Sequence, residues 1–377
     1  MLKKTQTKMA LLAVAVTLLL YAANSQFNPD NSSAAVHKTA TLVEPKSNPA
    51  VSQPIQATKP QTATNTEAKA KTEHIVAADL ATDADSTQTQ KSFINVSDDR
   101  PTGAPQDIEI NSLDELSALF DSLNYNTKSW RDGNREVPRL TFEAVSERWQ
   151  KTSHNMPVQQ KKMVFFRLIA PLILVANENI LLERRLIESA PLDDIVLLNI
   201  AVKYRIIDSV YDSLSEPQRQ ALLEDIDILP PSLVLAQAAE ESGWATSRFT
   251  LEGNAFFGQW DFSGNGMVPK QQRKELGNYG VARFDTPLAS VEGYLLNLNT
   301  NNAYKKLRSL RAKLRANNMP ITGIELATTL DKYSERGQAY IDGLIEMILY
   351  NKLDQVDDAY LNDGAPLHLI PTADRQP

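Results

Sequence analysis

The uneven distribution of large apolar residues is the feature that most limits what this chain can fold into. Hydrophobic residues make up 42% of its 377 residues, enough for a sizeable core, but they are scarce between residues 26 and 104. Stretches such as "KPQTATNTEAKAKTE" offer too little apolar surface to offset the entropy of ordering the chain. We therefore expect a disordered linker over residues 26–104 and one folded region after it, although this length would allow two domains.

The N-terminus has the pattern of an export signal. Three lysines precede the apolar run "MALLAVAVTLLLYAA". Its last residue, Ala23, and the nearby Ser25 are small and are spaced as in a cleavage site. The run is shorter than the roughly 20 apolar residues of a typical membrane span. We predict a signal peptide at residues 1–25 and a mature protein in the periplasm or cell envelope. Only an uncleaved signal would associate the protein with a membrane, by anchoring it in the inner membrane.

Composition excludes several classes of function. A net charge of -7 and a pI near 5.3 argue against nucleic acid as a partner, because phosphate binding needs a basic surface. The absence of cysteine excludes disulfides, thiolate catalysis and cysteine metal sites. The histidines lack the spacing of metal ligands; they are His37, His74, His154 and His368. We predict a monomer that uses no metal ion or other cofactor.

Helical periodicity dominates after the linker. In "NSLDELSALFDSLN", Ser112 and Glu115 have the spacing of a capping box. The long apolar stretch "VQQKKMVFFRLIAPLILVANENILLERRLIES" contains Pro171, which predicts a kink or two abutting helices. "SEPQRQALLEDI" predicts a further helix capped by Ser215. We assign residues 105–228 to an N-terminal helical region.

The composition of the sequence changes after about residue 243, where glycine becomes frequent. Seven of the 14 glycines lie between residues 243 and 280, which predicts an irregular lobe with short strands or turns. Helical patterns then resume, and the polar end at residues 357–377 predicts a flexible tail. The basic stretch "KKLRSLRAKLR" invites a membrane or polyanion interpretation, but its leucine stripe favours a packed helix with a solvated face. The predicted fold is mainly α with a small β lobe.

A pair of glutamates ends the helix predicted within "PPSLVLAQAAEESGW". Two prolines suit the first turn and Gly243 suits the end. Glu241 shares a face with Val234 and Gln237, whereas Glu240 points about 100 degrees away. A solvated helix end is the ordinary interpretation of such a pair. However, a carboxylate near a helix C-terminus opposes the helix dipole, and an apolar face raises the pKa of a carboxyl group. Glu241 is therefore a candidate general acid.

This stretch resembles the catalytic-helix signature of glycoside hydrolase family 73, the bacterial endo-β-N-acetylglucosaminidases that include the flagellar-rod muramidase domain and Bax-type relatives. The usual form, L-x-x-A-Q-A-A-x-E-S-G-W-G, aligns its catalytic glutamate with Glu241 and a variable position with Glu240. Ala245 replaces the common final glycine. This departure puts the exit of the helix in doubt, but it touches no catalytic atom.

Four further stretches resemble family elements in the same order: "NAFFGQW", "VARFDTPLASVEGYLLNL", "NAYKKL" and "DKYSERGQAYIDGLIEMI". The last one would contribute a cleft tyrosine, Tyr333. The first two match the family pattern at Asn254, Phe257, Gly258, Phe284, Asp285, Ser290 and Tyr294. The resemblance covers about residues 229–354, and the helices upstream resemble the extra N-terminal part of the Bax-type branch.

The resemblance implies a lysozyme-like α+β fold with a catalytic domain at residues 229–356. It further implies an exported hydrolase that cleaves the β-1,4 bond after N-acetylglucosamine in peptidoglycan, with Glu241 as general acid. The second carboxylate stays open between Glu275, in a loop rich in basic residues, and Asp261. A third route uses the substrate's own acetamido group, oriented by Tyr333. The ordinary alternative for Glu275 is a solvated surface residue.

The residues expected to bind the glycan come from the same stretches, and core packing is the alternative for each aromatic ring among them. They are Gln237, Trp244, Asn254, Phe257, Gly258, Trp260, Tyr279 and Phe284.

Two other functions fit the same residues. A lytic transglycosylase would also use one glutamate, but it would leave a 1,6-anhydro end on the muramic acid. An inactive module would bind peptidoglycan or act as a scaffold without cutting it. The stereochemical outcome, any activity on N-glycan cores, protein partners and regulation stay open.

Overall fold

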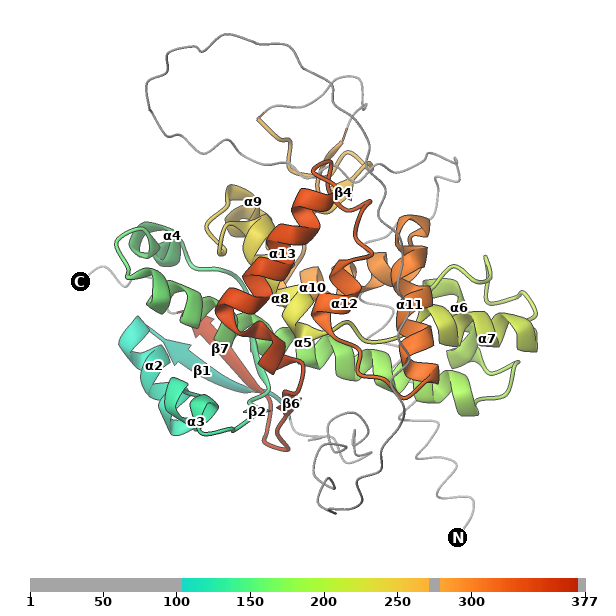
Figure 1. Ribbon diagram of the computed structural model, residues 1–377, viewed down its shortest axis with the longest axis horizontal. Coiled ribbons are helices and arrows are strands. Elements are labelled where there is room, and N and C mark those ends of the chain that lie inside the picture. The colour runs from blue at the N-terminus through green and yellow to red at the C-terminus, as the bar shows by residue number, and fades with distance from the viewer. Residues whose placement is uncertain (1–103, 271–278, 372–377) are drawn as a thin grey trace, which may run out of the picture. The chain divides into compact units, whose positions relative to one another are not determined.

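A computed structural model describes residues 104–270 and 279–371, which belong to one compact unit of the chain (Figure 1). The predicted signal peptide lies outside the described residues, as does the predicted linker apart from its last residue. Helices dominate the described part, and the strands are short. The mainly α fold with a small β lobe is therefore confirmed.

The chain enters the fold through short elements that surround a central helix. Half of the predicted capping box is present, because Ser112 Oγ accepts a hydrogen bond from the backbone N–H of Glu115 at 3.1 Å. The Glu115 carboxylate accepts the N–H of Asn111 at 2.7 Å instead of that of Ser112. The elements are β1 (Gln106–Ile110), α2 (Leu113–Ser122), α3 (Thr127–Arg131), β2 (Glu136–Val137), β3 (Leu140–Phe142) and α4 (Glu147–Ser153).

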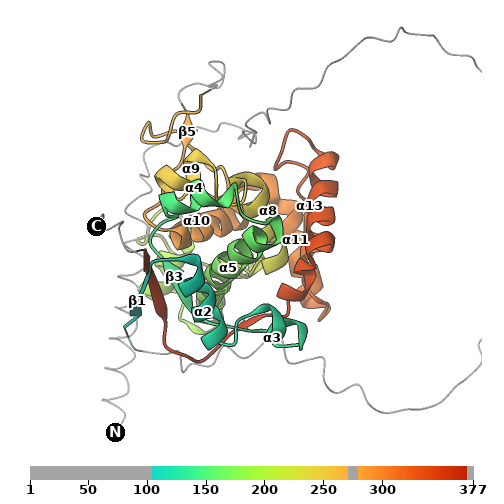
Figure 2. The same cartoon turned by 90° about the vertical axis from the view of Figure 1, so that its left-hand side faces the viewer.

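The central helix α5 (Val158–Ser189) runs through the middle of the molecule, with β1 and α2 on one side and α13 on the other (Figure 2). It is one continuous helix with Pro171 inside it, so the prediction of two abutting helices is wrong. Among the described helices, α5 is long and apolar enough to cross a membrane by length and composition. However, 61% of its most apolar window is buried inside the protein, as a core helix would be.

The remaining helices pack around α5 and one another. The loop between α9 and α10 carries the predicted irregular lobe, in which β4 and β5 pair antiparallel and Met267 bridges to Val281. The elements are α6 (Ile195–Lys203), α7 (Glu216–Asp225), α8 (Pro231–Ser242), α9 (Arg248–Gly253), β4 (Trp260–Asp261), β5 (Gly280–Val281), α10 (Pro287–Thr300), η2 (Asn302–Tyr304), α11 (Lys305–Ala316), α12 (Gly323–Ala327), α13 (Gln338–Asn351) and η3 (Leu353–Val356).

The C-terminal segment forms strands. β7 (Leu367–Pro371) lies between β1 and β3 and pairs in parallel with both, so the two ends of the described chain lie side by side (Figure 1). β6 (Tyr360–Leu361) pairs with β2. The prediction of a flexible tail is therefore wrong for residues 357–371, because these strands satisfy their backbone groups in a ladder with the N-terminal segment.

One core joins the regions upstream and downstream of residue 228. Buried side chains of α5, such as Ile169 and Ile173, belong to the same cluster as Leu233 and Val234 of α8. No boundary between compact units falls at residue 228 or 229. The predicted N-terminal helical region and catalytic domain are thus parts of one folded unit.

The helix of "KKLRSLRAKLR" is α11, and its arginines point inward. Arg311 is fully buried and donates to the backbone carbonyls of Asp225, Asp227 and Ile228. Arg308 pairs with Asp225 at 2.7 Å. The predicted packed helix is present, but part of its basic face is buried, because the arginines satisfy the carbonyl groups of the link between α7 and α8.

Candidate active site

Helix α8 positions the central glutamate. Pro230 and Pro231 begin the helix, and Gly243 ends it in the left-handed conformation with φ 58°. The side chains from Ser232 to Ala239 are fully buried against α5, α12, α13 and η3, whereas Glu240 is exposed and Glu241 is partly buried. Helix α8 is therefore anchored in the core along most of its length, and Glu241 lies at its end near the surface.

The opposite end of α8 is fixed by a carboxylate from another element. Asp357 accepts hydrogen bonds from the N–H of Ser232 at 2.8 Å, from its hydroxyl at 2.7 Å and from the N–H of Gly323 at 3.0 Å. It thus caps both α8 and α12. Burial raises the pKa of Asp357 to about 6, and the three hydrogen bonds oppose this shift. A Cβ at Gly323 would lie 2.8 Å from the nitrogen of Leu233, so the two helix ends meet only through a glycine.

The carboxyl group of Glu241 has two different oxygen environments. Oε1 accepts a hydrogen bond from the hydroxyl of Tyr340 in α13 at 2.8 Å. Oε2 faces Gly258, where a Cβ atom would lie 3.8 Å away and the backbone φ is 62°. Burial raises the pKa of Glu241 to about 8, although the Tyr340 hydrogen bond lowers it; Glu240 raises it and Arg336 lowers it. The group is therefore mostly protonated at neutral pH.

Gln237 lies one turn before Glu241 and is fully buried. Its Nε2 donates to the hydroxyl oxygen of Tyr340 at 3.0 Å, and its Oε1 accepts the hydroxyl of Tyr294 in α10. Both ends of its amide are therefore used inside the protein, and Gln237 contacts the site through Tyr340. Glycan binding by Gln237 stays a prediction.

The chain leaves α8 through three consecutive left-handed residues, Gly243, Trp244 and Ala245, with φ of 58°, 63° and 61°. This conformation costs a non-glycine residue about 1–2 kcal/mol. The turn is held by Ser242, whose Oγ accepts the N–H of Ala245 at 2.8 Å. Ala245, the one departure from the family signature, therefore occupies a position that favours glycine. Strain of this kind is common beside active sites.

The ring of Trp244 packs against α5. Phe165 and Phe166 meet it edge-on with ring centres 5.5 and 5.4 Å away, and the ammonium group of Lys162 lies 5.0 Å from its centre. The Trp149 indole donates to the Trp244 carbonyl oxygen at 3.2 Å. The described contacts of the Trp244 ring are thus with α5, and its role as a sugar platform stays a prediction.

Asn254 ties together three segments of the chain. Its Nδ2 lies 3.2 Å from the carbonyl oxygen of Glu143, 3.2 Å from that of Phe284 and 3.1 Å from that of Asp285. The residue is buried and ends α9 with φ 51°. These Nδ2 contacts lie inside the protein, and the contact of Asn254 with a sugar stays a prediction.

Two stacked pairs of aromatic rings lie close to the glutamate. Phe257 lies parallel to Tyr294 with ring centres 4.0 Å apart, and Tyr333 lies parallel to Tyr340 at 5.5 Å. The hydroxyl of Tyr333 donates to the carbonyl oxygen of Phe257 at 3.2 Å. All four rings are buried. The tyrosine whose hydroxyl contacts Glu241 is thus Tyr340, and Tyr333 supports it by stacking.

The irregular lobe carries the other predicted platforms. Trp260 is partly exposed and stacks on the buried ring of Tyr279 at 4.7 Å, while Phe262 beside it is 44% exposed. Phe284 packs against Met267 and Val281 and lies close to Gly293 of α10. Among these rings, Trp260 and Phe262 therefore offer accessible apolar surface.

Of the two candidates for the second carboxylate, the structure describes only Asp261. Asp261 lies on β4, and its carboxylate accepts bonds from the N–H of Ser263 at 2.8 Å and from its hydroxyl at 2.9 Å. Glu275 lies outside the described residues. Within residues 104–270 and 279–371, no group of three or more His, Asp or Glu side chains could hold a metal ion.

Sequence reasoning missed Tyr340 and Arg336. Arg336 pairs with Glu240 at 2.9 Å and places its guanidinium group 5.0 Å from the centre of the Tyr340 ring. Tyr340 is the second tyrosine of the matched segment "DKYSERGQAYIDGLIEMI", so the signal was present. The sequence does not show where the Tyr340 side chain points, because this depends on how α13 packs on α8.

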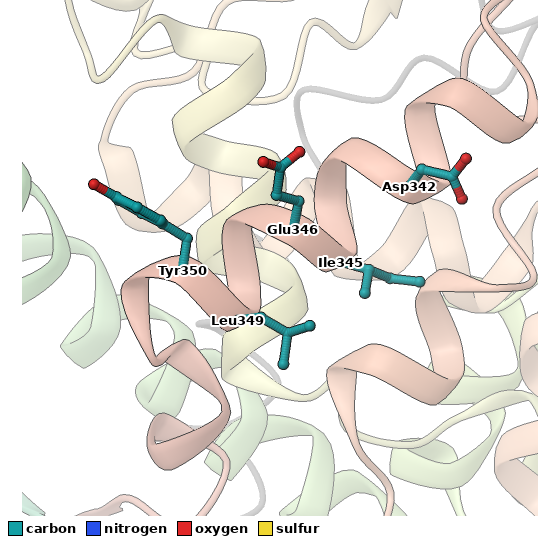
Figure 3. Close-up of a pocket in the computed structure, with 5 residues that line it drawn as sticks. All are labelled: Asp342, Ile345, Glu346, Leu349 and Tyr350. Atoms are coloured by element: carbon teal, nitrogen blue, oxygen red, sulfur yellow. The ribbon is translucent and has the colours of Figure 1, made fainter.

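A shallow hollow of about 390 Å³ lies along α13 (Figure 3). Its lining residues are Asp342, Ile345, Glu346, Leu349 and Tyr350. Because Tyr340 faces α8, Ile345 and Leu349 lie roughly on the opposite side of α13. The hollow therefore does not contain the Glu241 carboxyl.

The arrangement around Glu241 is suited to proton donation. A carboxyl group that is neutral at the working pH can protonate a leaving group, provided that it is oriented and reachable. Glu241 is neutral through burial, oriented by Tyr340 and partly exposed beside Gly258.

Comparisons with known proteins relate the chain to one described family. Residues 216–353 match the family described as Glucosaminidase, mannosyl-glycoprotein endo-beta-N-acetylglucosaminidase. Among curated proteins, "Protein bax" of Escherichia coli (strain K12) is 31% identical over 199 residues, which cover 51% of this chain and 70% of the relative. No solved structure gives a significant match.

Proposed function

The chain belongs to the Bax-type branch of the glucosaminidase family, and from that premise we propose that it is an endo-β-N-acetylglucosaminidase that hydrolyses peptidoglycan. The glucosaminidase domain supports a glycosidase that acts on glycans. The finer proposal is cleavage of the β-1,4 bond after N-acetylglucosamine, with Glu241 as general acid.

The observation that carries this proposal is the state of the Glu241 carboxyl. Hydrolysis of a glycoside needs an acid that protonates the leaving oxygen, and an ordinary glutamate is ionised at neutral pH. Burial raises the pKa of Glu241 to about 8, so it retains its proton. Its neighbour Glu240 has different surroundings, because it is exposed and pairs with Arg336.

The second catalytic group is proposed to be Glu275, with Asp261 as its competitor. Asp261 already accepts two hydrogen bonds from Ser263, which would have to be exchanged for bonds to water or sugar. The substrate's acetamido group is the third route. Tyr333 would orient it only by giving up its bond to the Phe257 carbonyl. A large loss of activity in Glu275→Gln with little loss in Asp261→Asn is the expected result.

The proposed glycan platform is the aromatic surface of the irregular lobe. Trp260 and Phe262 retain accessible apolar rings, which suit the faces of sugar residues. The predicted signal peptide supports the proposal, because an exported protein would meet peptidoglycan in the periplasm or cell envelope.

The test is mass spectrometry of purified peptidoglycan after digestion, with wild type, Glu241→Gln and Glu240→Gln compared. Wild type should produce new reducing N-acetylglucosamine ends. Glu241→Gln cannot give up a proton, so its activity should fall by about 10² to 10⁴, whereas Glu240→Gln should stay close to wild type. Anhydro-muramyl ends would assign a lytic transglycosylase, and no new ends would assign a binding or scaffold protein.

A further inference from the structure

A line of hydrogen bonds connects α10 to the Glu241 carboxyl through the core. The Tyr294 hydroxyl donates to Gln237 Oε1, Gln237 Nε2 donates to the Tyr340 oxygen at 3.0 Å, and the Tyr340 hydroxyl donates to Glu241 Oε1 at 2.8 Å. Tyr294, Gln237 and Tyr340 have exposed fractions of 0%, 0% and 1%. Water therefore cannot replace any of these partners without opening the core.

The line has a direction, which Tyr294 sets. If the Gln237 amide were reversed, its NH₂ would face Tyr294, and the Tyr294 hydroxyl would need another acceptor. In the described residues 104–270 and 279–371, the Tyr294 hydroxyl donates its hydrogen to Gln237 Oε1. The amide is therefore held with its NH₂ group toward Tyr340, and the Tyr340 hydroxyl hydrogen must point at Glu241.

This direction distinguishes the two oxygens of the carboxyl group. Oε1 already accepts a hydrogen, so a proton placed there would face the Tyr340 hydroxyl hydrogen. The proton of the neutral acid therefore belongs on Oε2. That oxygen faces Gly258, which has no side chain and whose hypothetical Cβ would lie 3.8 Å away. A glycosidic oxygen needs room at this point to approach the acid within hydrogen-bond reach.

On the basis of the proposed function, we infer that Tyr340, oriented by Gln237 and Tyr294, is a positioning residue that keeps the acid proton on Oε2 of Glu241, beside Gly258. Tyr340 acts through Glu241 and does not need to touch the substrate. Burial and the nearby Glu241 raise the pKa of Tyr340 well above its ordinary value, so the hydroxyl stays a neutral donor.

Charged and polar groups other than Tyr340 also surround the Glu241 carboxyl. Glu240 and Arg336 act on its charge from α8 and from the loop before α13, and the neutral hydroxyls of Tyr294 and Tyr333 lie nearby. A variant that removes only the Tyr340 hydroxyl leaves all of these in place.

The test compares Tyr340→Phe with a matched control, Tyr204→Phe. Tyr204 is also buried and also donates its hydroxyl to a carboxylate, Glu183 Oε2, at 2.6 Å, but this pair lies between α5 and α6. The kcat, the KM and the dependence of kcat on pH are measured for full-length proteins. The Glu241 carboxyl is titrated by ¹³C NMR, with Glu241→Gln identifying its signal.

The expected result is a clear shift in Tyr340→Phe and none in the Tyr204→Phe control. Its Glu241 pKa should rise, because the lost hydrogen bond favoured the ionised form, and kcat should fall by about tenfold or more with little change in KM. Tyr294→Phe should shift the same quantities in the same direction, by less. Tyr204→Phe should lower the melting temperature and leave kcat, KM and the Glu241 titration as in wild type.

Two failures are distinguishable. An unchanged Glu241 titration and an unchanged pH profile in Tyr340→Phe would overturn the positioning role, even if wild type hydrolyses peptidoglycan. A wild type that produces no new glycan ends would overturn the proposed function. In that case the NMR titration alone still decides the role of Tyr340, because it needs no substrate.

Discussion

At the scale of single residues, Glu240 and Glu241 have opposite surroundings although they are neighbours in the chain. Glu240 forms a partly exposed ion pair with Arg336, a type of contact worth at most about 1 kcal/mol. Glu241 is held neutral by burial at the C-terminal end of α8, where the helix dipole also disfavours a negative charge. Such a residue opposes folding whenever it ionises.

This opposition predicts a pH-dependent effect of Glu241→Gln on stability. The unfolded Glu241 loses its proton near the ordinary pKa of 4.5, whereas the folded one keeps it up to a pKa of about 8. Between these values the folded state binds more protons, so the free energy of unfolding falls as the pH rises. Glu241→Gln lacks this loss. Its melting temperature should exceed that of wild type increasingly as the pH rises through this window.

Thermal unfolding of both proteins at a series of pH values measures this difference. Glu240→Gln serves as the control and should stay within about 1 kcal/mol of wild type. A constant difference between Glu241→Gln and wild type from acidic to alkaline pH would show that Glu241 is not held neutral by the fold.

The sequence indicated Glu241 because the signal is local. Helical periodicity places it on an apolar face, and the position of Gly243 places it at the helix end. Tyr340 contacts the same carboxyl from 99 residues away, and no period within α8 reports such a contact. The internal hydrogen bonds of Gln237 and Asn254 were not predicted for a related reason: a polar residue has the same sequence pattern whether it faces a substrate or the core.

At the scale of elements, Asp357 fixes where α8 and α12 begin. Its carboxylate accepts three hydrogen bonds from the first turns of both helices. Asp357→Ala would leave these buried donors without their acceptor. Each donor that finds no other acceptor would cost about 1–3 kcal/mol of stability. We expect a clear loss of stability in urea unfolding at neutral pH, and a smaller loss of activity as α8 shifts.

The neighbouring Asp358 provides the matched control for this prediction. Its side chain is exposed, so Asp358→Ala should change the free energy of unfolding by no more than about 0.5 kcal/mol. Equal effects of the two substitutions would show that the cap contributes nothing.

The buried arginines of helix α11 allow another prediction about stability. Burial lowers the pKa of Arg311 to about 10, although Asp227 opposes this shift, and its guanidinium group binds three backbone carbonyls. Burial alone would raise the pKa of Asp227, but Arg311, Arg315 and Arg184 together lower it. Arg311→Met should therefore cost about 3 kcal/mol or more.

Lys313→Met on the exposed side of the same helix is the control and should be nearly neutral. The free energy of unfolding measures both. A comparable small effect of the two substitutions would mean that water replaces Arg311 without cost. The sequence predicted the leucine stripe of α11 but not the inward arginines, because burial of a charge depends on acceptors that only the folded α7–α8 link provides.

At the scale of the whole molecule, elements distant in sequence complete one another. The matched family region begins at residue 216, yet its helix α8 packs on α5, and the C-terminal β7 pairs with β1 and β3. The Trp149 indole and the Glu143 carbonyl bind the turns on either side of the site. Pairing of this range has no signature in a short window, which is why the C-terminal strands were expected to be loose.

The last prediction concerns the segment before the fold. Residues 30–95 have the composition of a chain that cannot bury enough apolar surface to order itself, and the described fold begins after them. Their deletion should leave the melting temperature and the hydrolysis of soluble glycan fragments nearly unchanged. Activity on intact cell walls should fall if the segment gives the domain reach from the membrane. Thermal unfolding and both assays test this with the full chain as control, and a large drop in melting temperature would show that the segment packs on the fold.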